Sequence, residues 1–158
     1  MHYMERILGF ANTRFMQMTK GQYELKRDTS GLSGTSGKVG LDLNVIDHYD
    51  GSERSVKTLS GGESFMAALS LALGMADEVQ NSAGGIQLDT MFVDEGFGHL
   101  DEDCVHKAVN ALLGLSGNNR LIGVISHVAE LERMLDKKLI VRKAKAGGDL
   151  GSYVELQV

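Results

Sequence analysis

Two short apolar runs on either side of a helical segment constrain the fold of this chain most. They read "MFV", Met91 to Val93, and "LIGVI", Leu121 to Ile125. Such runs are typical of strands covered on both faces, so we expect both to be buried in a sheet. A helix is predicted between them, from the capping residue Asp101 to about Leu115. Strands separated by a helix predict a parallel sheet with a right-handed crossover, and hence an α/β protein.

The other segments predict helices and antiparallel strands around this sheet. Apolar residues recur at helical spacing in some of them and alternate with polar residues in others. Helices are expected at 1–19, 65–80 and 128–135, and strands at 23–27, 39–48, 138–143 and 153–158. The chain is therefore predicted to have an antiparallel β unit at the front and a hairpin at the C-terminal end.

Composition excludes several classes of protein. With 42% hydrophobic residues among 158, the chain is long and apolar enough for one domain with one core. The net charge of −5 argues against a protein built wholly around nucleic acid. No apolar run approaches about 20 residues, so we expect no membrane partner. The single cysteine, Cys104, fits a reducing compartment, and we expect a cytoplasmic protein.

The stretch "GLSGTSGKV", Gly31 to Val39, looks like a phosphate loop but departs from the required pattern. That loop needs Ser or Thr after its Gly-Lys pair, and here Val39 follows Lys38. Leu32 also stands where the first glycine of the loop should be. We therefore predict a flexible connection with a solvated Lys38, and no Lys-bearing phosphate loop in this chain.

The stretch "LSGGE", Leu59 to Glu63, has the residues of a phosphate grip. Glycines let a ligand approach the backbone, and the N-terminus of a helix attracts anions. Ser60 can add a directed hydrogen bond, and Glu63 is favoured in the first helical turn. An ordinary helix cap with a glycine turn explains the same residues.

Polar residues also follow both predicted parallel strands, where α/β sheets bind ligands. After the first strand, Asp94 can hold Mg²⁺, and Glu95 can orient and deprotonate an attacking water. After the second, His127 can donate a hydrogen bond to a terminal phosphate. A strand that simply ends in solvent and a structural histidine are the alternatives.

The stretches "LSGGE", "MFVDE", "GFGHLD" and "ISH" occur in this order between Leu59 and His127. Together they resemble the C-terminal lobe of an ABC-type (P-loop NTPase) ATPase head. They correspond to its signature motif, Walker B with the catalytic glutamate, D-loop and H-loop. The phrase "DEGFGHLD" resembles the SbcC family, the SMC-like ATPase subunits of the SbcCD exonuclease. Gly96 stands where transport ATPases usually have proline.

The resemblance implies ATP and Mg²⁺ as cofactors and a role for each motif residue. Ser60, Gly61 and Gly62 would contact the γ-phosphate held by an opposite head, and Asp101 would couple the two sites. The other implied roles are Mg²⁺ support, action on the attacking water and sensing of the γ-phosphate. The candidates for cofactor binding are Ser60, Gly61, Gly62, Glu63 and Asp101, for the metal Asp94, and for catalysis Glu95 and His127.

The resemblance also implies a larger protein around this chain. Residues 1–19 would be the stub of a returning coiled-coil helix, and residues 20–158 the C-terminal half of the head. Expected partners are the N-terminal lobe of the same protein, a second head, an SbcD-like metal-dependent nuclease and DNA. ATP hydrolysis would drive head engagement in the processing of DNA double-strand breaks and hairpins. Because Walker A belongs to the missing lobe, we expect the chain alone to be inactive as an ATPase.

Two other hypotheses remain open from the sequence. One is an SMC-like head that organises chromosomes without a nuclease, and the other is a stand-alone α/β binding module whose motifs are accidental. A basic stretch, "DKKLIVRKAKAGG" at residues 136–148, is either a DNA contact or the solvated face of a hairpin.

Overall fold

The helices and strands that the structure describes form three separate sheets and a row of packed helices. The computed structural model describes residues 2–28, 42–82, 90–94, 96–98, 100–116, 121–143 and 151–157. The described helices are α1 (His2–Met18), η2 (Val56–Thr58), α2 (Gly61–Ser82), α3 (Glu102–Ser116) and α4 (Ala129–Met134). The strands are β1 (Tyr23–Arg27), β2 (Leu43–Asp47), β3 (Glu53–Ser55), β4 (Thr90–Asp94), β5 (Leu121–Ile125), β6 (Lys138–Arg142) and β7 (Tyr153–Gln157).

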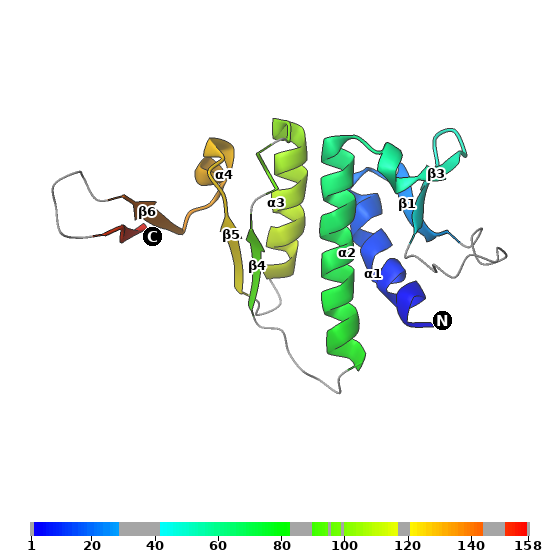
Figure 1. Ribbon diagram of the computed structural model, residues 1–158, viewed down its shortest axis with the longest axis horizontal. Coiled ribbons are helices and arrows are strands. Elements are labelled where there is room, and N and C mark those ends of the chain that lie inside the picture. Colours follow the sequence, from blue (N-terminus) through cyan, green and yellow to red (C-terminus); the bar gives the residue numbers. More distant parts are fainter. Residues whose placement is uncertain are drawn as a thin grey trace.

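These elements follow one another as layers across the molecule (Figure 1). The antiparallel sheet β1-β2-β3 packs against α1, α1 packs against α2, and α2 against α3. Beyond α3 lies the parallel pair β4-β5, and the antiparallel hairpin β6-β7 projects at the far side (Figure 1). None of the described helices combines the length and the apolar character that crossing a membrane requires. The predicted α/β class, with an antiparallel front unit and a final hairpin, is confirmed.

The pair β4-β5 is parallel, as predicted, but the described residues cover it on one face only. Met91 and Val93 pack against the core, whereas Phe92 between them is 66% exposed. On β5, Leu121 is 64% exposed and Ile125 is also exposed. The prediction that both strands are buried on both faces is therefore wrong for the described chain. Helix α3 covers one face, and the outward residues follow the period of two that a strand imposes.

Close contact between α1 and α2 organises the core. Gly74 of α2 lies against α1 so tightly that a Cβ there would be 2.7 Å from the carbonyl oxygen of Ile7. Beside this contact, Arg6 pairs with the buried Glu78, and other apolar residues extend the core to the sheets. The largest fully buried apolar side chains are Phe15, Leu25, Val45, Leu73, Phe97, Val105 and Val109. One apolar cluster thus joins α1, β1, β2, α2 and α3.

The front sheet contains a strand that the sequence analysis did not predict. Antiparallel pairing joins β1 to β2 and β2 to β3, so β2 lies in the middle. Strand β2 was predicted at 39–48. Among the described residues it begins at Leu43 and ends at Asp47. The amide of His48 donates to the carbonyl oxygen of Gln22 at 2.8 Å, and the chain then turns through Asp50 and Gly51 towards β3. Residues 39–41, like the loop 31–39, lie outside the described residues.

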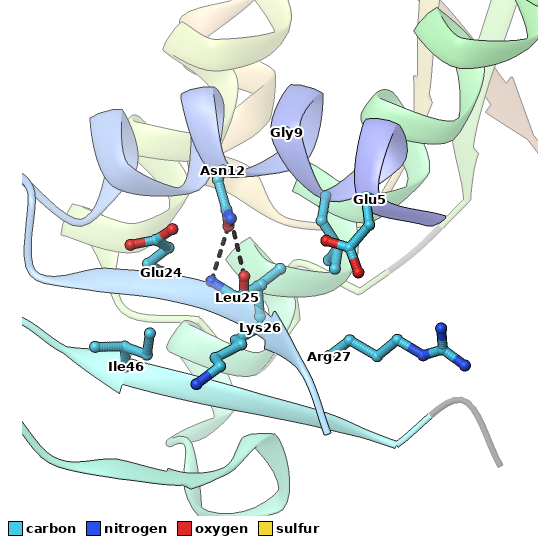
Figure 2. Close-up of a pocket in the computed structure, with 9 residues that line it drawn as sticks. Glu5, Gly9, Asn12, Glu24, Leu25, Lys26, Arg27 and Ile46 are labelled. Atoms are coloured by element: carbon cyan, nitrogen blue, oxygen red, sulfur yellow. Dashed lines mark hydrogen bonds between the residues drawn. The ribbon is translucent and has the colours of Figure 1, made fainter. Parts of the chain in front are cut away.

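The side chain of Asn12 on α1 forms hydrogen bonds with the backbone of β1. The Asn12 amide donates to the carbonyl oxygen of Leu25 at 2.9 Å, and its oxygen accepts from the Leu25 amide at 2.8 Å. Figure 2 shows these two bonds at a groove of about 350 Å³ between α1 and β1. The groove is lined by Glu5, Lys26 and neighbouring residues, and none of the described candidate site residues lines it.

Candidate functional site

The candidate phosphate grip is the N-terminus of α2, which starts four residues earlier than predicted. The Ser60 hydroxyl accepts a hydrogen bond from the Glu63 amide at 3.3 Å, and the Ser60 amide donates to the Glu63 carboxylate at 2.8 Å. This reciprocal arrangement is a capping box, which the Ser-x-x-Glu spacing encodes and which the sequence analysis overlooked. Gly61 and Gly62 therefore occupy the first helical turn, where N–H groups have no partner within the helix.

A second layer of residues lies behind the capping box. The hydroxyl of Tyr23 donates to Glu63 at 3.0 Å, and Arg54 lies over the tyrosine ring at 5.6 Å from its centre. Burial opposes ionisation of Glu63, but hydrogen bonds from Ser60 and Tyr23 outweigh it and hold the pKa of this carboxyl below its ordinary value. Burial and the bond to Glu63 raise the pKa of Tyr23. The Glu63 carboxylate is thus charged and fixed in place.

The candidate metal residue Asp94 ends β4 at the carboxyl edge of the parallel pair. In the strand register Asp94 lies beside Ile125, the last residue of β5, so His127 follows at the same edge. Asp94 and His127 are both exposed, and Glu95 lies outside the described residues. Among the residues that the structure describes, no three His, Cys, Asp or Glu side chains gather as a metal-binding group.

The segment after the acidic pair packs against the first turns of α2. Gly96 has a φ of +96°, and a Cβ on it would lie 2.6 Å from the ring of Phe65. The same ring meets Phe97 edge to face, with 4.8 Å between ring centres. Only glycine combines this backbone conformation with so close an aromatic neighbour. The glycine found in place of the proline of transport ATPases therefore has a local steric reason.

Asp101 and His127 lie close to the residues described so far, Asp101 at the start of α3 and His127 just after β5. Asp101 caps α3, as predicted, by accepting from the Cys104 amide at 2.8 Å, and this bond lowers its pKa. A Cβ on Gly62 would lie 2.8 Å from the Cys104 sulfur, so the start of α3 touches the start of α2. Burial and the nearby Asp101 raise the pKa of Cys104. On the other side, a Cβ on Gly98 would lie 3.6 Å from the His127 ring.

These contacts bring four separate stretches of sequence to one end of the molecule. In Figure 1 the N-terminus of α2 and the carboxyl end of β5 both lie at the top of the view. Sequence analysis named the polar residues of this end but missed the side chains that hold them together. The missed residues are Tyr23, Arg54, Phe65, Phe97 and Cys104. The capping-box spacing was a usable signal for Glu63. Phe97 stands within the motif "GFGHLD", but no local pattern predicts the contacts that these five side chains make.

Comparison with solved structures defines the class of protein. One structure, described as "Structural biochemistry of ATP-driven dimerization and DNA stimulated activation of SMC ATPases", matches with a TM-score of 0.71. The match covers 98% of this chain and 84% of that chain, at 19% sequence identity. The fold is accordingly that of an SMC-type ATPase head.

Sequence comparison then identifies the family. A family model described as "SbcC/RAD50-like, Walker B motif" matches residues 36–113. The SbcC subunit of the nuclease SbcCD from Vibrio cholerae is 49% identical over 147 residues, and that from Treponema pallidum is 46% identical over 145. These matches cover 93% and 92% of this chain. The chain belongs to the SbcC/RAD50-like family, and it spans 14% of the length of each of these two relatives.

Proposed function

We propose that this chain is the part of an SbcC-like ATPase head that closes over ATP held by another lobe. The observation that carries the proposal is the convergence of Ser60, Asp94, Asp101 and His127 at one end of the molecule. These residues come from separate stretches of sequence, and all lie at helix N-termini or at or just past the carboxyl ends of strands, where polar ligands bind in α/β folds.

In this proposal the capping box presents Ser60 to the γ-phosphate on an opposite head. Because the Ser60 oxygen already accepts from the Glu63 amide, its O–H proton remains to be donated to a phosphate oxygen. The N–H groups of Gly61 and Gly62 point along the helix start and add the positive end of its dipole. Phosphoryl transfer depends largely on such positioning and charge stabilisation.

The carboxyl edge of β4 and β5 would supply the remaining groups. The exposed carboxylate of Asp94 fits Mg²⁺, which proteins hold through one or two carboxylates together with substrate phosphates. Mg²⁺ would neutralise phosphate charge there. Glu95 would accept a proton from the attacking water, and His127 would donate to the γ-phosphate. Asp101, at the start of α3, would couple the two sites across a dimer of heads.

The exposed face of β4 and β5 supports the proposal that another lobe packs there and binds ATP. Parallel sheets are normally covered on both faces, yet β4 and β5 expose Phe92, Leu121 and Ile125. We propose that the N-terminal lobe of the same protein covers this face and carries the Lys-bearing phosphate loop. Residues 1–19 would then be the stub of the coiled coil and residues 20–158 the C-terminal half of the head.

For the whole protein we propose ATP-driven head engagement in a DNA-processing nuclease. The support is the identity of 46–49% to proteins named as SbcC subunits of the nuclease SbcCD. The partners would be a second copy of the head, an SbcD-like nuclease subunit and DNA, in the cytoplasm. Likeness to SMC heads concerns the fold alone, so the chromosome-organising alternative has no comparable support.

The test is reconstitution of the head from its two parts. The chain alone should hydrolyse ATP negligibly, and adding the N-terminal lobe should produce turnover that Glu95→Gln abolishes. Ser60→Arg should then block ATP-dependent pairing of heads, because a long cation would fill the space of the phosphate. Robust hydrolysis by the chain alone, or unimpaired pairing of the Ser60→Arg variant, would contradict the proposal.

A further inference from the structure

Glu63 is held by two partners on opposite sides of its carboxylate. One oxygen accepts from the Ser60 amide at 2.8 Å, which is the capping-box contact. The other oxygen accepts from the Tyr23 hydroxyl at 3.0 Å, a contact that spans 40 positions of sequence. A capping box needs only the first contact. The second therefore fixes the carboxylate beyond what the helix itself requires.

Tyr23, the first residue of β1, is buried and held by contacts with α1. The residue is 6% exposed, and its ring stacks on Phe15 of α1 with 6.1 Å between ring centres. Its amide donates to the Thr19 hydroxyl at 3.2 Å, which ties the backbone to the end of the same helix. Contacts with α1 thus help to fix the tyrosine ring, and with it the hydroxyl that reaches Glu63.

Arg54 of β3 determines which way the tyrosine proton points. Its guanidinium donates to the Tyr23 hydroxyl at 3.5 Å and to the Thr58 hydroxyl at 2.6 Å. Arginine has no acceptor, and an ionised carboxylate has no donor. Tyr23 must therefore accept from Arg54 and donate its own proton to Glu63. Arg54 thus donates to Tyr23, Tyr23 donates to one oxygen of Glu63, and the Ser60 amide donates to the other, so the hydrogen bonds converge on the Glu63 carboxylate.

We propose that Tyr23 is a positioning residue for the phosphate-gripping serine, acting through Glu63 to hold Ser60 in its binding geometry before the γ-phosphate arrives. The inference rests on the proposed function, because it assigns Tyr23 to the same site. A donor held in place before binding needs little reordering when the charge arrives. Without the tyrosine hydroxyl, the Glu63 carboxylate can turn and the Ser60 backbone loosens.

The experiment uses Tyr23→Phe in the intact protein that contains this chain. Pairing of heads at a given ATP concentration should weaken about tenfold, the change expected for losing one hydrogen bond to a charged group. Nucleotide binding by unpaired heads should stay unchanged, because that binding belongs to the other lobe. Tyr49→Phe is the matched control: it removes the same hydroxyl from a side chain that is 70% exposed.

Two further measurements decide whether Tyr23 acts through Glu63. In a Glu63→Ala background, Tyr23→Phe should have no additional effect on pairing. Without nucleotide, hydrogen exchange of the Ser60 amide should be about tenfold faster in Tyr23→Phe than in Tyr49→Phe. Equal exchange in the two variants, unchanged pairing, or an equal loss in the Glu63→Ala background would overturn the inference.

The exchange measurement separates this inference from the proposed function. If wild-type heads fail to pair with ATP, the proposed function fails, and the Ser60 amide still reports whether Tyr23 positions it. If wild-type heads pair and Ser60→Arg blocks them, while Tyr23→Phe leaves pairing and exchange unchanged, only the positioning role is overturned.

Discussion

At the residue scale, Glu63 shows how one side chain serves both the helix and the candidate site. Burial alone would favour its neutral form, yet hydrogen bonds from Ser60 and Tyr23 favour the charged form more strongly. Arg54 adds a favourable charge nearby. The lowered pKa means that the folded protein binds the Glu63 proton less readily than the unfolded chain does. Folding stability must therefore depend on pH through this residue.

The expected sign of that dependence is definite. The contribution of the Glu63 charge to stability is fully present above the unfolded pKa, about 4.3, and is lost as pH falls through the folded pKa. Glu63→Gln cannot titrate, so its deficit in unfolding free energy relative to wild type should be largest near neutral pH and shrink in acid. Urea unfolding between about pH 7 and pH 3 measures it. A deficit that does not change with pH would contradict the assignment.

At the scale of elements, the contact between α1 and α2 decides how the two helices cross. Gly74 meets backbone atoms of α1, with the Ala11 nitrogen 2.8 Å from where a Cβ would stand. Ion pairs lie beside this contact between α1 and α2, which we call the seam, and one of them joins Arg14 and Asp77 at 2.6 Å. Backbone cannot give way as a flexible side chain can, so the close approach depends on the missing side chain of Gly74.

Gly74→Ala should therefore destabilise the protein, by about 1–3 kcal/mol for an overpacked core. Gly9→Ala is the matched control on the facing helix, since nothing lies within 4 Å of a Cβ at Gly9. There the same change should stabilise by about 0.5–1 kcal/mol, because alanine is the better helix former. Thermal unfolding of the two variants compares them directly, and equal shifts in one direction would refute this account of the seam.

At the scale of the whole molecule, the strands beyond α3 present apolar surface to solvent. Besides β4 and β5, the hairpin β6-β7 has one apolar face, because Leu139 pairs with Leu156 and Val141 with Val154 in the strand register. Leu139, the most exposed of the four, is 71% exposed. Contiguous apolar surface of this kind marks an interface. The proposed lobe partner explains both uncovered sheets at once.

Replacing Leu139 and Leu156 by serine should weaken association with the N-terminal lobe about tenfold or more, because burial of both side chains would be lost. Lys138→Ser with Gln157→Ser is the matched control on the opposite face of the hairpin, since these residues pair in the next register position. Sedimentation of each variant with and without the lobe provides the measurement, and equal effects of both pairs would count against this interface.

Local spacing by itself determined much of this protein. The helical periodicity of residues 1–19, the short apolar runs of β4 and β5, and the cap at Asp101 depend on neighbours within a few positions. The motif order from Leu59 to His127 was likewise readable, because each motif is a short local pattern. For that reason the sequence alone predicts the fold class, the parallel pair and the family.

Only the tertiary structure decided how these parts meet. The contacts of Tyr23 with Glu63, Gly62 with Cys104 and Gly98 with the His127 ring join residues that lie far apart in sequence. The exposed face of β4 and β5 was likewise mispredicted, since an apolar run shows that a strand needs cover but not which polypeptide supplies it. Such contacts follow from how whole elements pack, because a side chain's distant neighbours are set by every helix and sheet between them.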